Sequence, residues 1–207
     1  MRSNILMLSI IIIIGCFPVH AQTHNIPPLA KIPDMNFDKN IPDKAIEYDE
    51  DKLPLIFKID KLSISLGRTT LTEVSNALKT GIPLHDGKGY YQCYSIPKYS
   101  HQIWFVTVGQ NFSEPITELV IARGKPLPTE FCPMVTASTH PIFSDNIRLN
   151  LPEELINVVL GKPLNKKQEQ SLYFYLLPQK MGKLKIQTHI DATGLDKIKI
   201  TKESFYQ

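Results

Sequence analysis

The chain is poor in cysteine and tryptophan, and it lacks the short motifs that mark common enzymes. Its 207 residues include three cysteines and one tryptophan, and the formal net charge is +3. No G-x-S-x-G, H-E-x-x-H, phosphate-loop or dinucleotide pattern occurs in it. No run of Lys and Arg is interleaved with aromatic residues, so a nucleic-acid partner is not expected. We therefore predict a protein that is not an enzyme and that needs no metal or cofactor.

The longest apolar run lies at the N-terminus, where Ile5 to Ile14 follow the positive residue Arg2. This run is too short to be a permanent membrane span. It is followed by Val19-His20-Ala21, which places small residues where a signal peptidase reads them. We predict that residues 1–21 are a signal peptide.

An alternative processing site lies inside the same stretch. The sequence Ile13-Ile14-Gly15-Cys16 resembles a bacterial lipobox, in which Cys16 would be acylated and become the new N-terminus. Both readings send the chain across a membrane. We therefore expect an exported protein, periplasmic or secreted, with an outer-membrane lipoprotein as the alternative. Contact with a membrane would then occur only through the lipid anchor.

The two remaining cysteines, Cys93 and Cys132, form an even count in an exported chain, which predicts a disulfide bond. The bond would close a loop of 39 residues (132 − 93) and contribute on the order of 4 kcal/mol. The alternative is a reactive thiol. No C-x-x-C pattern and no neighbouring base supports that alternative.

Residues 22–55 contain scattered prolines and follow neither a strand period nor a helix period. Because proline removes backbone donors and favours extended conformations, we predict an extended tether. It would act as a spacer from a membrane or partner, or as a loosely packed arm.

The rest of the chain contains one pattern twice. Each copy has a helix that ends near a glycine, an aromatic strand that ends in proline, and two further strands. The landmark pairs are Pro83 and Pro163, Pro97 and Pro178, Phe105 and Ile186, and Ile121 and Ile200, with separations of 80, 81, 81 and 79 residues. This constant offset predicts a duplicated α-β-β-β unit, covering 56–123 and 147–207, joined by a connecting segment at 124–146.

The helix of each unit has its own start and stop signals. In the first, Thr70 and Glu73 predict a capping box, and Gly81 is the expected stop. In the second, Pro152 occupies the first helical position and Gly161 is the stop. The expected apolar stripes are Leu71, Val74 and Leu78 in the first helix, and Leu155, Val158 and Val159 in the second.

One helix can cover only one face of three strands. We therefore predict an α+β fold in which the two units form one six-stranded antiparallel sheet with both helices on one face.

The run from Leu66 to Val74, followed by Leu78, Gly81 and Pro83, resembles the small outer-membrane lipoproteins of the SmpA/OmlA (BamE) type. Two such units in tandem are similar to the secreted β-lactamase inhibitor protein, which presents a concave sheet to its target. The resemblance spans residues 62–202, although Asn150 stands where the second copy should have a glycine. It implies a non-catalytic binder of proteins.

The two copies differ on the sheet face that points away from the helices. There the second copy has Lys185, Gln187, His189, Lys197 and Lys199, and the first copy has Trp104, Val106, Val108, Glu118 and Val120. An apolar face of this kind needs a cover. The cover would be the connecting segment, the second copy, or a partner protein bound at Trp104, Tyr94, Val106 and Val120.

Two pairs of residues are candidates for acid–base or metal chemistry. His85-Asp86 lies in a glycine-rich turn, and His189 and Asp191 are two apart on a predicted strand. A turn and a solvated strand face are the simpler interpretations of both pairs.

Three functional hypotheses follow. The first is an exported, non-catalytic protein-binding module of the bacterial cell envelope, acting as an inhibitor, an immunity-type protein or an assembly accessory. The second is a structural envelope lipoprotein anchored at Cys16. The third is a small secreted hydrolase.

Overall fold

A computed structural model of the protein describes residues 56–204, with breaks at 110, 128, 144–145, 164, 168–171 and 180–181. The predicted leader (1–21), Cys16 and the predicted tether (22–55) lie outside the described residues. The described part of the chain contains no helix that is long and apolar enough to cross a membrane.

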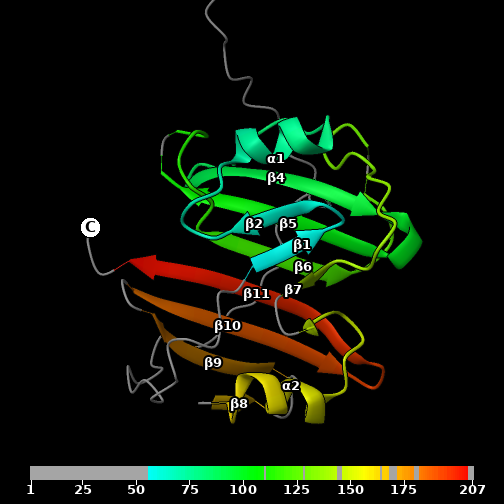
Figure 1. The fold of residues 1–207 in the computed structure, drawn as a ribbon, viewed down its shortest axis with the longest axis vertical. Coiled ribbons are helices and arrows are strands. Elements are labelled where there is room, and N and C mark those ends of the chain that lie inside the picture. Colours follow the sequence, from blue (N-terminus) through cyan, green and yellow to red (C-terminus); the bar gives the residue numbers. More distant parts are fainter. Residues whose placement is uncertain are drawn as a thin grey trace, which may run out of the picture.

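An eight-stranded antiparallel sheet forms the centre of the α+β fold (Figure 1). Its order is β3-β4-β5-β6-β11-β10-β9-β8, so the last strand, β11, pairs with β6 in the middle. Two of the eight strands, at the edges, are short additions to the six predicted. The strands are β3 (Leu84–His85), β4 (Gly89–Ile96), β5 (His101–Val108), β6 (Glu118–Arg123), β8 (Asn165–Lys167), β9 (Leu172–Gln179), β10 (Gly182–Asp191) and β11 (Gly194–Ser204).

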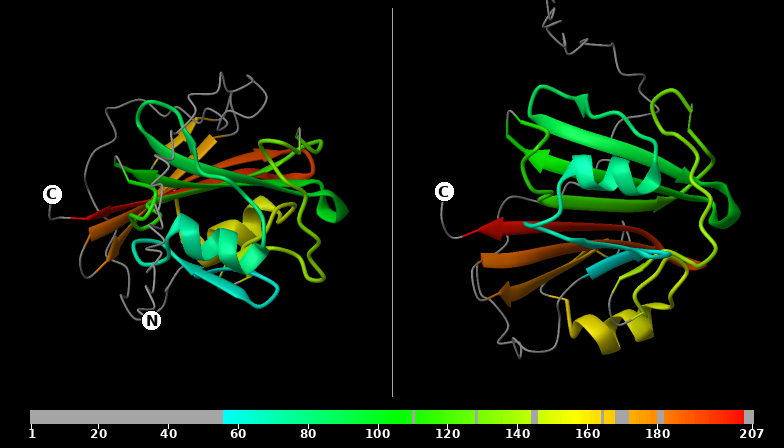
Figure 2. Two further views of the ribbon diagram at one scale, coloured as in Figure 1. Left: turned by 90° about the horizontal axis from the view of Figure 1, so that it is seen from above. Right: turned by 45° about the horizontal axis from the view of Figure 1, so that its top comes forward.

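One face of this sheet is covered by a second layer, which contains both helices and a small sheet (Figure 2). The small sheet has the order β2-β1-β7 and is antiparallel. Its strands are β1 (Ile56–Ile59), β2 (Leu62–Ser65) and β7 (Ile142–Phe143), and the helices are α1 (Leu71–Leu78) and α2 (Glu153–Leu160). We call the covered face of the large sheet the inner face and the opposite one the outer face.

The first helix begins where the sequence predicts. Thr70 is the N-cap, and its hydroxyl accepts a hydrogen bond from the Glu73 amide (3.2 Å). The Glu73 carboxylate in turn accepts from the Thr70 amide (2.7 Å), which completes the capping box. The helix ends at Leu78, three residues before the predicted stop at Gly81, because Lys79 adopts the left-handed conformation and serves as the C-cap.

The second helix ends at Gly161 as predicted, but its buried face is not the predicted one. Ile156 and Leu160 are buried, whereas Leu155 and Val158 are 49% and 77% exposed. The predicted stripe is therefore wrong for Leu155 and Val158, whereas Val159 is half-buried and packs against the main core. In an eight-residue helix with several apolar residues, both alignments satisfy helical spacing, and tertiary packing selects one of them.

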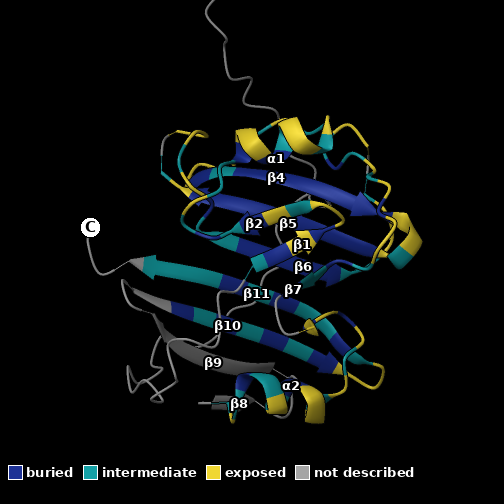
Figure 3. Ribbon diagram, viewed as in Figure 1, coloured by how far each residue is buried: buried dark blue, intermediate teal, exposed yellow. Residues whose placement is uncertain are grey.

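The two faces of the sheet contribute to two separate hydrophobic clusters. The larger one fills the space between the inner face and the second layer, and includes Phe57, Leu71, Phe105, Ile156 and Ile200. The smaller one lies on the outer face of the first half and consists of Tyr91, Cys93, Trp104, Val106, Val120, Ala122 and Cys132. Figure 3 shows that β4, β5 and β6 are buried almost throughout, whereas β10 and β11 alternate between buried and half-buried residues.

The predicted partner surface on Trp104, Tyr94, Val106 and Val120 is wrong, because all four side chains are at most 9% exposed. Cys132 and Leu127 from the connecting segment pack against the Trp104 cluster, so this segment is the cover. Tyr94 is not on that face at all. It pairs with Ile103 rather than Trp104, so its side chain points into the inner-face core.

Candidate binding groove

The connecting segment passes from the outer face around the edge of β4 to the inner face. On the outer side, the predicted disulfide bond joins Cys132 to Cys93 of β4, with a Cα–Cα distance of 4.6 Å. At the edge, Ser95 pairs with Met134: the Ser95 amide donates to the Pro133 carbonyl (3.0 Å), and the Val135 amide donates to the Ser95 carbonyl (2.8 Å). The segment then reaches β7, which pairs with β1.

On the inner side, the segment is held by the carboxylate of Asp60, in the turn between β1 and β2. This carboxylate accepts bonds from the Ser138 amide (3.0 Å), the Thr139 amide (2.8 Å) and both hydroxyls (2.8 Å each). The backbone amide of Ser138, then that of Thr139, and then the hydroxyls hold the pKa of Asp60 well below its usual range. Asp60 itself has φ +50°, a left-handed conformation that Asp tolerates better than most residues.

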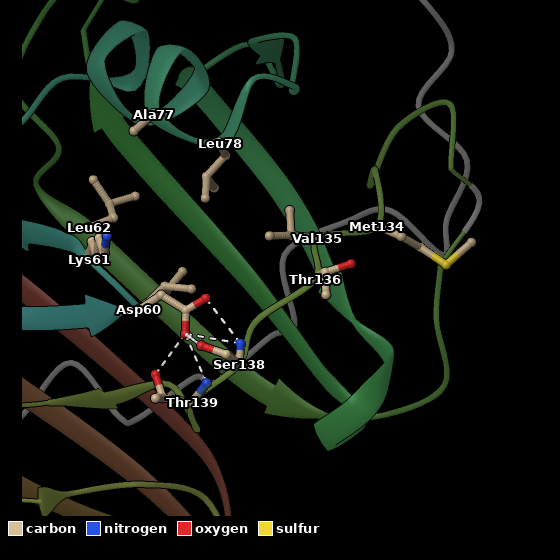
Figure 4. Close-up of a pocket in the computed structure, with 11 residues that line it drawn as sticks. Asp60, Lys61, Leu62, Ala77, Leu78, Met134, Val135, Thr136, Ser138 and Thr139 are labelled. Atoms are coloured by element: carbon tan, nitrogen blue, oxygen red, sulfur yellow. Dashed lines mark hydrogen bonds between the residues drawn. The ribbon is translucent and has the colours of Figure 1, made fainter.

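A groove of about 780 Å³ lies between the end of α1, the β1–β2 turn and residues 134–139. Figure 4 shows the three walls, with Ala77 and Leu78 on the helix and Met134 and Val135 on the connecting segment. Most of its lining is aliphatic: Ile59, Leu62, Ala77, Leu78, Met134 and Val135. Met134 is 56% exposed at the mouth. Asp60 is the only acid among the lining residues. Its Oδ1 accepts all four bonds, and its Oδ2 accepts only a share of the Ser138 amide.

The groove is bordered by positive side chains. Lys61 lines it directly, and Lys79 follows the last residue of α1. Lys98 lies at the far wall, where its ammonium donates to the Ser138 carbonyl (2.9 Å). The carboxylate of Asp60 keeps its negative charge while it accepts these bonds, but the three lysines outnumber it, so the rim presents an excess of positive charge to a ligand.

The candidate catalytic pairs have structural partners in the fold. In the turn after β3, Asp86 accepts from the amides of Lys88 (2.9 Å) and Gly89 (3.1 Å), and His85 Nδ1 accepts from the Gly87 amide (3.3 Å). These bonds define a tight turn of the Asx type rather than an acid–base pair.

His189 and Asp191 belong to one charged network centred on Arg123. The strand β10 has a register shift after His189, and Arg123 ion-pairs with both Asp191 and Asp196. His189 lies 3.0 Å from Asp196, and Asp191 forms an ion pair with Arg123. The hydroxyl and then the amide of Thr193 lower the pKa of Asp191. Within the described ranges, no group of three or more His, Cys, Asp or Glu residues is placed to hold a metal ion.

Sequence reasoning missed the groove because its key acid lies in a short turn. The Ile59-Asp60-Lys61-Leu62 stretch places two polar residues between apolar ones, but it lacks the glycine that marks a two-residue hairpin. The contacts of Asp60 with residues 78 and 79 positions away could not be predicted from it.

These features define the class of molecule: an α+β protein with a disulfide-anchored connecting segment and an aliphatic groove. Comparison with protein-family models and with curated proteins gave no match. One solved structure with some likeness is a DUF4309 family protein, YjgB, from Bacillus subtilis, with 11% identity and a TM-score of 0.40 over 68% of this chain and 82% of that one. A likeness this slight carries no argument about fold or function.

Proposed function

We propose that this protein is an exported, non-catalytic protein-binding module of the bacterial cell envelope. The observation that carries the proposal is the groove beside α1. Its lining is mainly aliphatic, and its one acid, Asp60, holds the connecting segment through internal hydrogen bonds. A site of this composition can accept apolar side chains.

The charge around the groove favours a particular partner. Lys61, Lys79 and Lys98 border an aliphatic lining, so the best complement is an acidic protein loop that carries one or two large apolar side chains. The apolar side chains would occupy the space between Leu78 and Val135, and the acids would meet the rim lysines. Inhibitor, immunity-type and assembly-accessory roles all use a surface of this kind.

Site-specific photocrosslinking in the producing cells tests this proposal. A photoreactive residue replaces Met134 at the groove mouth, and a matched control replaces Val158, which is 77% exposed on α2. We expect a discrete adduct only from position 134, and we expect its yield to fall at least tenfold in a Lys61→Glu/Lys79→Glu variant. Equal adducts at both positions, or no adduct at 134 in folded protein, would contradict the proposal.

We also propose that the two halves arose by duplication of one unit. The chain order α1-β3-β4-β5-β6 matches α2-β8-β9-β10-β11, and the sheet order reads the same from both edges. The pairing at the centre supports this proposal. With an offset of 79 residues, Leu119 corresponds to Ile198 and Ile121 to Ile200. The structure pairs Leu119 with Ile200 and Ile121 with Ile198. Replacing each residue of one pair by its counterpart in the other half gives the other pair, as expected when a twofold axis relates the two halves. An experimental structure in which the halves failed to superimpose at this offset would refute it.

The similarity to SmpA/OmlA-type units stays a prediction, as does the route of export. Metabolic labelling with palmitate separates the two processing routes. Label that is incorporated in the wild-type chain and lost in Cys16→Ser would establish a lipoprotein, and an unlabelled chain beginning at Gln22 would establish cleavage by signal peptidase. A chain that stays in the cytoplasm would contradict export altogether.

A further inference from the structure

A pair of histidines lies where the connecting segment rests on the sheet. His101 begins β5, is 2% exposed, and neither of its ring nitrogens has a hydrogen-bond partner. The ring of His140 is 4.6 Å from it at an interplanar angle of 71°. Tyr99 completes the cluster, with its ring 4.6 Å from His140 and 6.0 Å from His101. Sequence reasoning assigned no role to either histidine.

The surroundings of His101 favour its neutral form. Burial is the main cause, followed by His140 and then Arg123, and together they lower its pKa from 6.5 to about 4. Arg123 is paired with His101 across β5 and β6, and its guanidinium is ion-paired with Asp191 and Asp196. The cluster therefore contains two imidazoles and a guanidinium, and no carboxylate contacts His101 among the described residues.

The same cluster adjoins the wall of the groove. His140 directly follows Ser138 and Thr139, which line the groove and are held by Asp60. The Tyr99 hydroxyl also donates to the Ser138 carbonyl (2.9 Å), and the Lys98 ammonium lies 5.0 Å from the Tyr99 ring. The wall has fixed ends, because the disulfide bond holds Cys132 and β7 pairs with β1. Separation of residues 134–140 from the sheet would break their bonds to Asp60 and Ser95 and expose Val135 and Ala137, but it would leave the disulfide bond and the β1–β7 pairing in place.

We propose that protonation of His101, which packs against His140, releases residues 134–140 from the sheet and thereby opens the groove wall in mildly acidic medium. In the closed form, His101 is buried, and neither of its ring nitrogens has an acceptor among the described residues to stabilise a positive charge. In the open form, water reaches both rings and the charge of Arg123 is screened. An exported protein experiences the pH of the external medium more directly than a cytoplasmic one, so acidification of the medium would reach this histidine cluster.

The direction follows from linkage. The closed form binds its proton on His101 less readily than the open form, so acid favours opening. The closed form is fully favoured above pH 6.5, and opening increases by up to tenfold per pH unit down to about pH 4. The total change is then about 300-fold. Asp60 contributes only at the acid end of this window, because its pKa is lowered from 3.8 in the closed form, and it also favours opening as the pH approaches 3.8.

Amide hydrogen exchange on the full chain tests the proposal. The amides of Ser138 and Thr139 are the reporters, because both donate to Asp60 only when the wall is closed. After correction for intrinsic exchange rates, we expect their opening constant to rise about tenfold per pH unit from 6.5 toward 4.5. The amides of β10 and β11 serve as internal controls and should not change.

Three variants make the test specific. His101→Phe keeps the ring volume and removes the titrating group, so the reporters should lose their pH dependence, and His140→Phe should weaken it if His101→Phe does not fold. His189→Gln, whose histidine pairs with Asp196 in the other half, should keep the full pH dependence. The proposal is overturned if protection at residues 138 and 139 is the same at pH 7 and 4.5, if the pH dependence persists in both phenylalanine variants, or if β10 and β11 open in parallel.

The effect of opening on a bound partner rests on the proposed function, but the exchange experiment does not. A flat exchange profile would disprove the switch and leave the groove intact as a binding site. An absent crosslink at residue 134 would disprove the binding proposal and leave the switch intact.

Discussion

The outer face of the large sheet differs between its two halves, as one row of residues that are paired across neighbouring strands shows. In the first half the row reads Cys93, Trp104 and Val120, and in the second half it continues with Lys199 and Gln187. The first three are buried beneath the connecting segment, and the last two are half-buried. The same strand pattern therefore carries an interior on one side of the β6–β11 junction and a polar surface on the other.

Glu118 marks the boundary between the two regions. It begins β6 on the outer face, and its carboxylate contacts Lys199 (2.9 Å) and Thr201 (3.3 Å) of β11. The difference between the halves teaches that alternation in a strand fixes which residues share a face, but not whether that face is covered. The cover comes from residues outside the repeated unit.

The sharpest test of this difference compares Trp104 with Lys185, a half-buried residue on the outer face of β10. We expect Trp104→Ala to lower the free energy of unfolding by about 3–5 kcal/mol, because it leaves a large cavity beneath Cys132. Lys185→Ala removes only an ion pair with Glu203 and should cost less than about 1 kcal/mol. Urea denaturation measures the free energy of unfolding of both variants. Equal decreases would mean that the outer face is no more buried in the first half than in the second.

Removal of the disulfide bond should make the first region resemble the second. We expect the Cys93→Ala/Cys132→Ala variant to lose about 2–4 kcal/mol of unfolding free energy. Trp104 is the only tryptophan in the chain, so its fluorescence should shift to the red as the cover loosens. Reduction should have the same effect on the wild type and none on the variant. An unshifted spectrum would show that the cover stays in place without the bond.

Asp60→Asn tests the other attachment of the same segment. The charged acceptor is lost but the shape is kept, and because the site is exposed we expect a loss of about 1 kcal/mol. Since hydrogen bonds hold the pKa of Asp60 below its ordinary value of 3.8, its contribution is fully present above about pH 4 and declines below. Acid denaturation of the variant should lack that component, whereas Lys61→Ala should behave as the wild type does.

The smallest effect is expected at the boundary. Lys199→Ala removes the ion pair with Glu118 and should cost about 0.5 kcal/mol at low salt, and less in 1 M salt because surface charges are screened. A loss that did not respond to salt would indicate that Lys199 contributes through packing of its aliphatic stem instead.

The sequence predicted the local features well. The capping box of Thr70 and Glu73, the disulfide bond, and the alternation of Leu184, Ile186 and Thr188 toward the core are all confirmed. Each of these depends on residues close in sequence or on simple counting of thiols.

The errors concern relations between distant segments. Tyr94 was placed beside Trp104, but the register of β4 against β5 sets Cys93 opposite Trp104 instead. The path of the connecting segment and the contacts of Asp60 depend on tertiary packing, for which a single sequence carries no period and no motif. Tertiary packing also decides which side of α2 is buried, so the sequence alone did not distinguish the exposed residues Leu155 and Val158 from the buried residues Ile156 and Leu160.

The position of β11 at the centre of the sheet has a consequence for how the chain folds. Leu119 pairs with Ile200, 81 positions later, so one edge of β6 stays open until the last strand has emerged from the ribosome. Long-range antiparallel pairing of this kind forms slowly, and an open edge invites pairing with other molecules. A nascent chain of this protein is therefore most prone to aggregate just before its final eleven-residue strand is in place, and export in an unfolded state would spare it that stage in the cytoplasm.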